Sequence, residues 1–230
     1  MSIVLGLTGS IGMGKSTVAA MIRRMGLPVF DADAEVHRLQ GPAGALVAAI
    51  EALHTGTTGP AGVDRAKLGQ AVLHDRIALH RLERLIHPAV DRARRAFLRR
   101  HAARRLVVLD IPLLFEKGGW RHVDAIAVVS APAWKQRARV LARPGMTPAR
   151  LARIRALQTP DAEKRRRADF VIDTGVAPSE TAAQIRHLLA CLSARGVRYC
   201  QECARSSSTP KPLASVPRTA TALSRSAASN

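Results

Sequence analysis

Five short apolar runs are spaced along the chain, and each has the length of a buried strand. They lie at residues 3–7, 27–30, 106–109, 125–129 and 170–172. Helix-forming segments at about 15–25, 132–141 and 178–192 lie between or after them. Strands that alternate with helices form βαβ units, so this order predicts an α/β fold around a parallel sheet of about five strands.

The long stretch from about 34 to 105 has a different pattern. It contains no convincing strand, and its apolar residues recur at helical spacing. The clearest series is Leu68, Val72, Ile77, Leu79, Leu82, Leu85 and Ile86. Pro88 interrupts this pattern directly after His87. We predict a helical insertion between two strands of the sheet.

The character of the chain changes again after about residue 193. From there to residue 230 the sequence is dominated by Ser, Thr, Ala, Pro and Arg, with no periodicity that could bury a face. Such a composition predicts a disordered basic tail at 193–230, behind one folded domain at 1–192. The pair Cys200 and Cys203 in this segment is a lone C-x-x-C, and we interpret it as incidental.

Composition fits one soluble α/β domain with an insertion. The chain has 230 residues and is 47% hydrophobic but only 3% aromatic, so aliphatic residues must fill the core. No apolar stretch is long enough for a bilayer, and the run at 3–7 is too short for a signal peptide. The three cysteines are odd in number and all lie near the C-terminus. We therefore expect no disulfide framework and a cytoplasmic location.

The net charge is strongly positive. Lys and Arg total 36 against 17 Asp and Glu, a formal charge of +19. Such a charge favours anionic partners such as nucleic acid, an acidic membrane surface or a phosphorylated small molecule, although compositional drift explains it equally well. Residues 92–105 hold seven arginines, but only Phe97 could stack on a base. We favour a solvated helix there and expect no nucleic-acid partner.

A glycine-rich loop follows the first predicted strand. Residues 9–16, GSIGMGKS, fit G-x-x-x-x-G-K-[ST] at every fixed position and lead into a helix. Loops of this kind point backbone N–H groups and a helix N-terminus at phosphate, and the lysine follows the β- and γ-phosphates. The predicted nucleotide-binding residues are Gly12, Met13, Gly14, Lys15, Ser16 and Thr17. The hydroxyl of Ser16 is the candidate ligand for Mg²⁺.

Acidic residues follow two of the predicted strands. Asp31 and Asp33 end the second strand, where alternation would send both side chains the same way. A carboxylate there could accept a proton from an attacking hydroxyl or hold Mg²⁺ through water, whereas the alternative is a cap for the next helix. Asp110 ends the strand at 106–109 and could hold Mg²⁺, or simply cap a turn.

A run of basic residues between 135 and 167 predicts a lid at about 143–168. Small kinases close such lids over ATP, which excludes water and neutralises the transferred group. We expect two or three of these arginines to contact phosphate and the others to be solvated surface.

Several motifs in this order resemble dephospho-CoA kinase. They are the loop at 7–17, Asp31-Ala32-Asp33, the segments 64–68 and 82–88, 110–116, then Gln136, Arg139, Arg143, Gln158, Pro160, Lys164, 168–169 and 171–173. The resemblance covers about residues 3 to 192. Ser10 and Met13 depart from the usual loop residues, but both stand at free positions of the motif.

The resemblance implies a P-loop NTPase-type three-layer fold with a helical substrate-binding insertion and a helical lid. It also implies transfer of the γ-phosphoryl group of ATP to the ribose 3′-hydroxyl of dephospho-CoA, giving CoA and ADP, with Mg²⁺ required. Asp33 would be the base, and Lys15 would hold phosphate. Arg139 and Arg143 would clamp ATP or stabilise the transferred charge.

The remaining implied roles concern the acceptor and the metal. Substrate-side residues would be Asp31, Arg65, His87, Pro112 and Leu113, and the metal-side residues Ser16 and Asp110. Two other functions share this core. One is a nucleoside or nucleotide kinase, and the other is a nucleic-acid-binding P-loop ATPase, whose activity DNA or RNA would stimulate.

Overall fold

The computed structural model describes residues 2–73 and 75–206, with side chains up to residue 193. Its centre is a five-stranded parallel sheet of β1 (Ile3–Thr8), β2 (Val29–Asp31), β5 (Leu106–Asp110), β6 (Ala125–Ser130) and β7 (Phe170–Asp173). The strand order is β2-β5-β1-β6-β7, and every neighbouring pair is parallel. The predicted α/β fold with about five parallel strands is confirmed.

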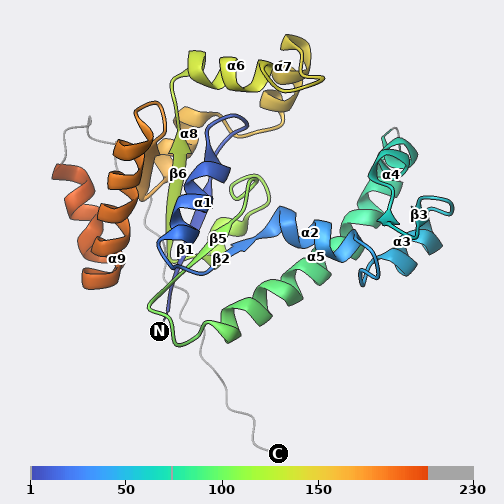
Figure 1. Cartoon of the computed structure of the whole chain (residues 1–230), viewed down its shortest axis with the longest axis horizontal. Coiled ribbons are helices and arrows are strands. Elements are labelled where there is room, and N and C mark those ends of the chain that lie inside the picture. The colour runs from blue at the N-terminus through green and yellow to red at the C-terminus, as the bar shows by residue number, and fades with distance from the viewer. Residues whose placement is uncertain (1, 74, 207–230) are drawn as a thin grey trace, which may run out of the picture.

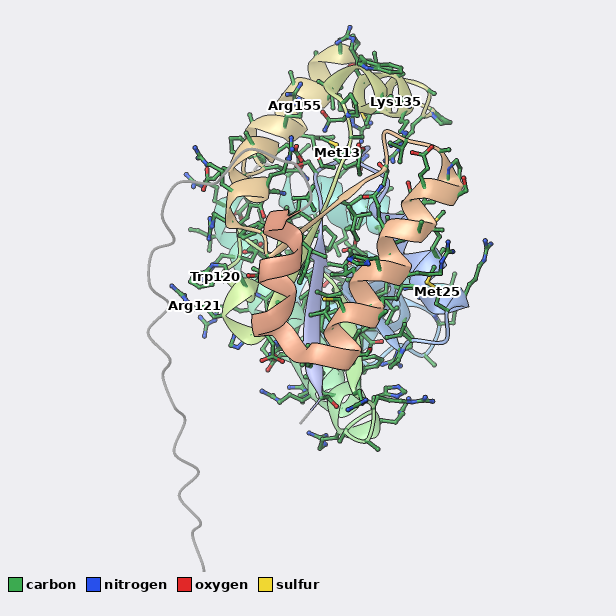
Figure 2. All side chains as sticks on the ribbon, turned by 90° about the vertical axis from the view of Figure 1, so that its left-hand side faces the viewer. Met13, Met25, Trp120, Arg121, Lys135 and Arg155 are labelled. Carbon is green, nitrogen blue, oxygen red and sulfur yellow. The ribbon has the colours of Figure 1, made fainter. Side chains whose placement is uncertain are left out.

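Helices cover both faces of this sheet, which gives three layers (Figure 1). On one face, α1 (Lys15–Arg24) and α9 (Pro178–Ser206) pack on aliphatic side chains of β1, β5 and β6. Figure 2 shows α9 lying across this face. On the other face, the second half of α5 (Arg76–Arg100) packs beside the loop at 111–123 and its 3-10 turn η1 (Gly119–His122). The helix α8 (Asp161–Arg167) also lies on this side, above β6.

The predicted helical insertion forms a subdomain that projects away from the sheet (Figure 1). It consists of α2 (Ala32–Gln40), α3 (Val47–Leu53), α4 (Arg65–Val72) and the first half of α5. Its own apolar cluster includes Leu39, Ile50, Leu68 and Leu82. Because the cluster contains residues from all four helices, the insertion has a core separate from the two sheet faces.

Two details of the insertion differ from the prediction. It contains a small antiparallel hairpin of β3 (Thr58–Gly59) and β4 (Gly62–Val63), where we found no strand. Two-residue strands are too short to leave a period in the sequence. In addition, α5 continues through Pro88. Pro88 is exposed, so the carbonyl left without an N–H donor can be solvated, and the helix does not end there.

The segment at about 143–168, for which we predict a lid, lies at the carboxyl ends of the strands. After β6 the chain forms α6 (Ala133–Leu141), then α7 (Pro148–Ala156), and returns through α8 to β7. Gly145, with φ +70°, makes the turn between α6 and α7. In Figure 1, α6 and α7 lie above the loop that joins β1 to α1.

The C-terminal part of the structure differs from the expected tail boundary. Helix α9 runs to Ser206 rather than ending at 192. The remainder of the predicted tail, 207–230, lies outside the described residues. Cys191, on α9, is disulfide-bonded, and the side chains of Cys200 and Cys203 lie outside the described part of the structure. Over the described residues, none of the helices combines the length and apolar character that crossing a bilayer requires.

Candidate active site

The glycine-rich loop between β1 and α1, residues 9–14, is called the phosphate loop from here on. It has the backbone geometry of an anion cradle. Gly12 and Gly14 adopt φ values of +76° and +85°, and Gly14 is the N-cap of α1. A Cβ on Gly12 would lie 2.4 Å from Cγ2 of Val140, and one on Gly14 would lie 3.0 Å from Oγ1 of Thr174. These two glycines are therefore required by φ and by the close approach of α6 and of the residue after β7.

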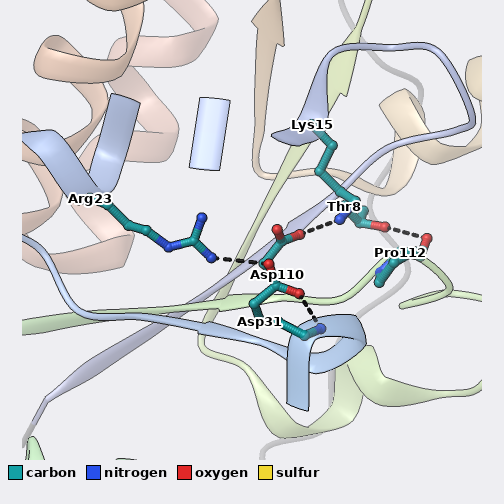
Figure 3. A network of polar contacts seen from close by, with 7 residues as sticks. Thr8, Lys15, Arg23, Asp31, Asp110 and Pro112 are labelled. Atoms are coloured by element: carbon teal, nitrogen blue, oxygen red, sulfur yellow. Dashed lines mark hydrogen bonds and ion pairs between the residues drawn. The ribbon is translucent and has the colours of Figure 1, made fainter. Parts of the chain in front are cut away.

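Lys15, the first residue of α1, lies over the end of β5. Its Nζ is 2.5 Å from Oδ1 of Asp110 (Figure 3). The Asp110 side chain is 3% exposed and that of Lys15 18%. The lysine therefore has a carboxylate partner at the mouth of the phosphate loop, where a nucleotide phosphate could replace it.

Burial is the main influence on the ionisation of Asp110. It raises the pKa of the carboxyl above the usual 3.8, and the nearby charge of Asp31 acts in the same direction. The hydrogen bond and charge of Lys15 lower this pKa but do not reverse the shift. Asp110 is thus a buried carboxylate whose charge depends on a cation beside it.

Asp31 stands next to Asp110 on the neighbouring strand. The two residues are register partners in the β2–β5 pair. Asp31 Oδ1 accepts from the backbone N–H of Ala34, which makes it the N-cap of α2, and Oδ2 accepts from Arg23 at 3.1 Å. Burial acts to raise the pKa of Asp31, but the Ala34 N–H and the Arg23 guanidinium outweigh it and lower the pKa. The capping interpretation is confirmed for Asp31.

Asp33 does not lie in a strand, contrary to the expectation from the sequence. The strand ends at Asp31, and Asp33 belongs to the first turn of α2. The expectation that strand alternation sends both aspartates the same way is therefore wrong, because the helix begins one residue before Asp33. Its side chain is exposed beside the capped end of α2.

The predicted substrate-side residues fall into two groups. Pro112 is close to the phosphate loop, since its carbonyl accepts from Thr8 Oγ1 at 3.0 Å (Figure 3), and Leu113 follows it half-buried. Arg65 and His87 are exposed on α4 and α5 of the helical subdomain. Arg65 Nη1 lies 2.9 Å from Nε2 of His37 on α2.

The two predicted lid arginines are not equivalent. Arg139, on α6, donates to Oγ1 of Thr174 at 3.1 Å and to its carbonyl at 2.7 Å. Thr174 Oγ1 in turn donates to the carbonyl of Met13 in the phosphate loop at 2.7 Å. Arg143 is exposed, and among the described residues its side chain has no hydrogen bond or ion pair. Arg139 thus supports the wall of the loop, whereas Arg143 is available to a ligand.

The structure adds residues that our site prediction omitted. Arg23 holds Asp31 from α1, and Thr174 joins Met13 to Arg139. Gln136 and Gln158 both contact the backbone of the phosphate loop. The two glutamines belonged to the family pattern in the sequence, which was the available signal. The sequence contained no signal for Arg23 or Thr174, because the residues that they contact belong to other helices, strands and loops.

A second buried ion pair joins α8 to the loop after β5, at the base of the predicted lid. Glu116, in the loop after β5, forms an ion pair with Lys164, whose Nζ lies 2.9 Å from Oε1, and the same oxygen accepts from the N–H of Thr159 at 2.8 Å. Lys164 on α8 is 0% exposed. Burial acts to raise the pKa of Glu116, but the close contact and charge of Lys164 and the backbone donors outweigh it and lower the pKa.

The loop also borders a cavity of about 410 Å³ below α7. Its lining includes Ser10, Gln136, Arg155, Gln158 and Asp161, but neither Lys15 nor Asp110. Figure 2 shows Met13 below the helices α6 and α7, which carry Lys135 and Arg155. The cavity therefore lies on the lid side of the loop, behind the phosphate cradle.

The donor set fits Mg²⁺ held together with a nucleotide. The described residues contain no group of three or more His, Cys, Asp or Glu that could hold a metal by themselves. The hydroxyl of Ser16 is exposed, and the carboxylates of Asp31 and Asp110 are register neighbours. Mg²⁺ usually takes one or two protein oxygens and completes its shell with phosphates and water. The few oxygen ligands that the protein offers here therefore fit a Mg²⁺ ion whose other ligands are phosphate oxygens and water.

Comparison with known proteins places this geometry in a family. Residues 3–178 match the family model described as dephospho-CoA kinase. A dephospho-CoA kinase from Novosphingobium aromaticivorans is 60% identical over 85% of this chain and 97% of its own length. One from Zymomonas mobilis is 49% identical over 85% of this chain and 100% of its own. A crystal structure from Thermus thermophilus is 35% identical, with TM-score 0.73, over 83% of this chain and 98% of its own.

Proposed function

The chain belongs to the dephospho-CoA kinase family, and from that premise we propose that it transfers the γ-phosphoryl group of ATP to the 3′-hydroxyl of dephospho-CoA. The products would be CoA and ADP, in the last step of CoA biosynthesis. The observation that carries the proposal is the family match over residues 3–178, which includes the Lys15–Asp110 pair and the neighbouring Asp31.

The donor half of the reaction is assigned to the phosphate loop. Free N–H groups at the start of α1 and the positive end of its dipole would bind the β- and γ-phosphates. Lys15 would exchange Asp110 for phosphate oxygens and follow the charge as it moves to the acceptor. The 2.5 Å pair with Asp110 supports this role, because it places the ammonium at the loop mouth before a nucleotide binds.

Mg²⁺ would be held by the Ser16 hydroxyl, with the Asp110 carboxylate beside it. When bound, it would neutralise charge on the β- and γ-phosphates. Release of Lys15 from Asp110 would leave that buried carboxylate in need of another cation, which supports this assignment.

Asp33 is our proposed base for the acceptor hydroxyl. Its carboxylate is exposed in the first turn of α2, at the junction between the sheet and the helical subdomain. Asp31 is less suited to that role, because its two oxygens already accept from Ala34 and Arg23. We assign Asp31 to holding α2, and therefore Asp33, at the edge of the sheet.

The acceptor would lie between this edge and the helical subdomain. Pro112 and Leu113 would form the sheet side of its site, and Arg65 and His87 the subdomain side. Arg143, which has no partner among the described residues, would reach phosphate when the lid closes, while Arg139 supports Thr174. A cytoplasmic location stays a prediction, supported by the use of ATP.

The direct test is ADP release by the full chain with ATP and Mg²⁺. We expect release that depends on dephospho-CoA, with no comparable rate for nucleosides and no stimulation by DNA or RNA. ADP formation that requires a nucleoside would favour the nucleoside kinase alternative. Stimulation by nucleic acid without dephospho-CoA would favour the ATPase alternative.

The variant Asp33→Asn tests the base. It keeps the shape of the side chain but cannot accept the proton, so kcat should fall by about 10²–10⁴-fold while the affinity for ATP is retained. Asp31→Asn is the matched comparison, because it weakens a cap and an ion pair and should reduce the thermal stability as well. A collapse of ATP affinity in Asp33→Asn would instead identify Asp33 as a metal or structural residue.

A further inference from the structure

Two glutamines bind the same residue of the phosphate loop from outside. Gln136, on α6, donates from Nε2 to the carbonyl of Ile11 at 2.8 Å. Gln158, between α7 and α8, accepts through Oε1 from the N–H of Ile11 at 3.1 Å. Both main-chain polar groups of Ile11 are therefore bonded to side chains more than a hundred residues away in sequence.

These bonds fix the directions of two peptide planes. In a trans peptide, the C=O and the following N–H point in opposite directions. Because the Ile11 carbonyl is directed to Gln136, the N–H of Gly12 is directed away from Gln136, toward the inside of the loop. Because the Ile11 N–H is directed to Gln158, the Ser10 carbonyl is turned the other way, where it accepts from Met13 N–H at 3.1 Å.

The Gly12 N–H has no hydrogen-bond acceptor among the described residues, although Gly12 is buried. Buried N–H groups are rarely left without an acceptor, so this one is suited to a ligand anion. The position is also sterically fixed, because a Cβ there would be 3.1 Å from the Gln136 carbonyl.

We propose that Gln136 and Gln158 are positioning residues that hold the Ile11 peptide planes so that the Gly12 N–H faces the nucleotide phosphate. Gln136 is the fixed member, since it is 3% exposed on α6. Gln158 is the member at the lid, one residue before Thr159, whose N–H is bonded to Glu116. The lid base and the phosphate loop are thereby joined through one residue, Ile11.

The two glutamines have opposite hydrogen-bonding roles, and this allows a sharp test. A glutamate at 158 keeps an acceptor for the Ile11 N–H, whereas an ionised glutamate at 136 loses the donor to the Ile11 carbonyl. Both changes add one negative charge beside the same residue. Gln70→Glu on the exposed surface of α4 is the control for added charge alone.

The readout is binding of ADP with Mg²⁺ to the full chain, measured by titration calorimetry, with thermal unfolding as a check on folding. We expect Gln158→Glu to bind ADP within about twofold of Gln70→Glu, and both Gln158→Met and Gln136→Glu to bind about fivefold more weakly, the usual worth of one hydrogen bond. At pH 6 the Gln136→Glu deficit should be smaller than at pH 8, because a buried carboxyl regains a donor when it is protonated.

Equal weakening by the two glutamate variants, or unchanged ADP binding by Gln158→Met, would overturn the proposal. If Gln136→Glu does not fold, the comparison of Gln158→Glu with Gln158→Met still decides it. The inference rests on the proposed function only in requiring that the loop binds a nucleotide. Since ADP binding is measured without dephospho-CoA, a wrong acceptor assignment would leave this result intact.

Discussion

The phosphate loop and the lid base each contain a lysine paired with a carboxylate, but the two pairs are built differently. At the loop, Asp110 is the more buried partner, 3% exposed against 18% for Lys15. At the lid base, Lys164 is the more buried partner, 0% exposed against 13% for Glu116. Burial raises the pKa of Asp110, whereas hydrogen bonds and the lysine charge overcome burial and lower the pKa of Glu116.

The difference lies in how many donors each carboxylate has. Glu116 accepts from the Thr159 N–H in addition to its ion pair with Lys164, and both interactions favour its charged form. Asp110 has Lys15 as its cation and Asp31 as an unfavourable neighbour. A pair with a single cationic donor can exchange that donor for a ligand, whereas a pair supported by backbone donors serves to join two segments.

Lys15→Ala should have the largest effect, and it should act on turnover. Loss of the phosphate partner should reduce kcat by about 10²–10³-fold or more, the range seen when one charge-stabilising donor is removed. ADP release with dephospho-CoA measures it. Unchanged turnover would show that Lys15 takes no part in the mechanism, and that the Lys15–Asp110 pair does not differ in function from the Lys164–Glu116 pair.

Lys164→Met should show the opposite pattern. It leaves Glu116 without its cation, and breaking a buried pair should cost roughly 3 kcal/mol of unfolding free energy. For a chain of this size that is a fall in Tm of about 6–12 °C. The kcat per folded molecule should fall far less than in Lys15→Ala. A Tm equal to that of the unsubstituted protein would show that the lid base does not depend on this pair.

The smallest effects should be opposite pH trends in stability. Glu116 has a pKa lowered from 4.5, so its contribution is present above that value and is lost as the pH falls through the lowered pKa. Asp110 has a pKa raised from 3.8, so its contribution is present at low pH and is lost as the pH rises through the raised pKa. Urea unfolding between about pH 2.5 and 7.5 measures both, because the Glu116 change lies below pH 4.5 and the Asp110 change above pH 3.8.

Asparagine and glutamine variants separate the two trends. Glu116→Gln should be less stable than the unsubstituted protein at neutral pH, and the difference should shrink as the pH falls. Asp110→Asn should gain stability relative to the unsubstituted protein as the pH rises. Two trends of the same sign would show that the carboxylates are not in different environments after all.

Local patterns in the sequence were sufficient for the sheet and for the phosphate loop. Apolar runs located all five strands of the sheet, and the spacing of Gly9, Gly14 and Lys15 located the loop. The strand order, with β5 between β2 and β1, was not predictable, because it depends on how the insertion returns the chain. That order is what brings Asp110 beside Asp31.

The predictions were wrong or incomplete where the surrounding structure, rather than the local sequence pattern, decides what a residue does. Asp33 was treated as a strand residue, but the cap provided by Asp31 starts α2 at Ala32. Pro88 was treated as a break, but its exposed position in α5 tolerates the lost hydrogen bond. The contacts of Arg23, Thr174 and the two glutamines with Asp31 and the loop join elements far apart in the chain, so no window of sequence could show them.

Helix α5 has a consequence for modularity. Its 25 residues span about 37 Å, and they contribute Leu82 to the subdomain core and Phe97 to the core under the sheet. Val90 packs against both cores. A chimera that exchanges the helical subdomain for that of another kinase would therefore have to be joined inside this helix, near Ala89 and Val90. A junction at either end of α5 would transplant half of one hydrophobic core into the other protein.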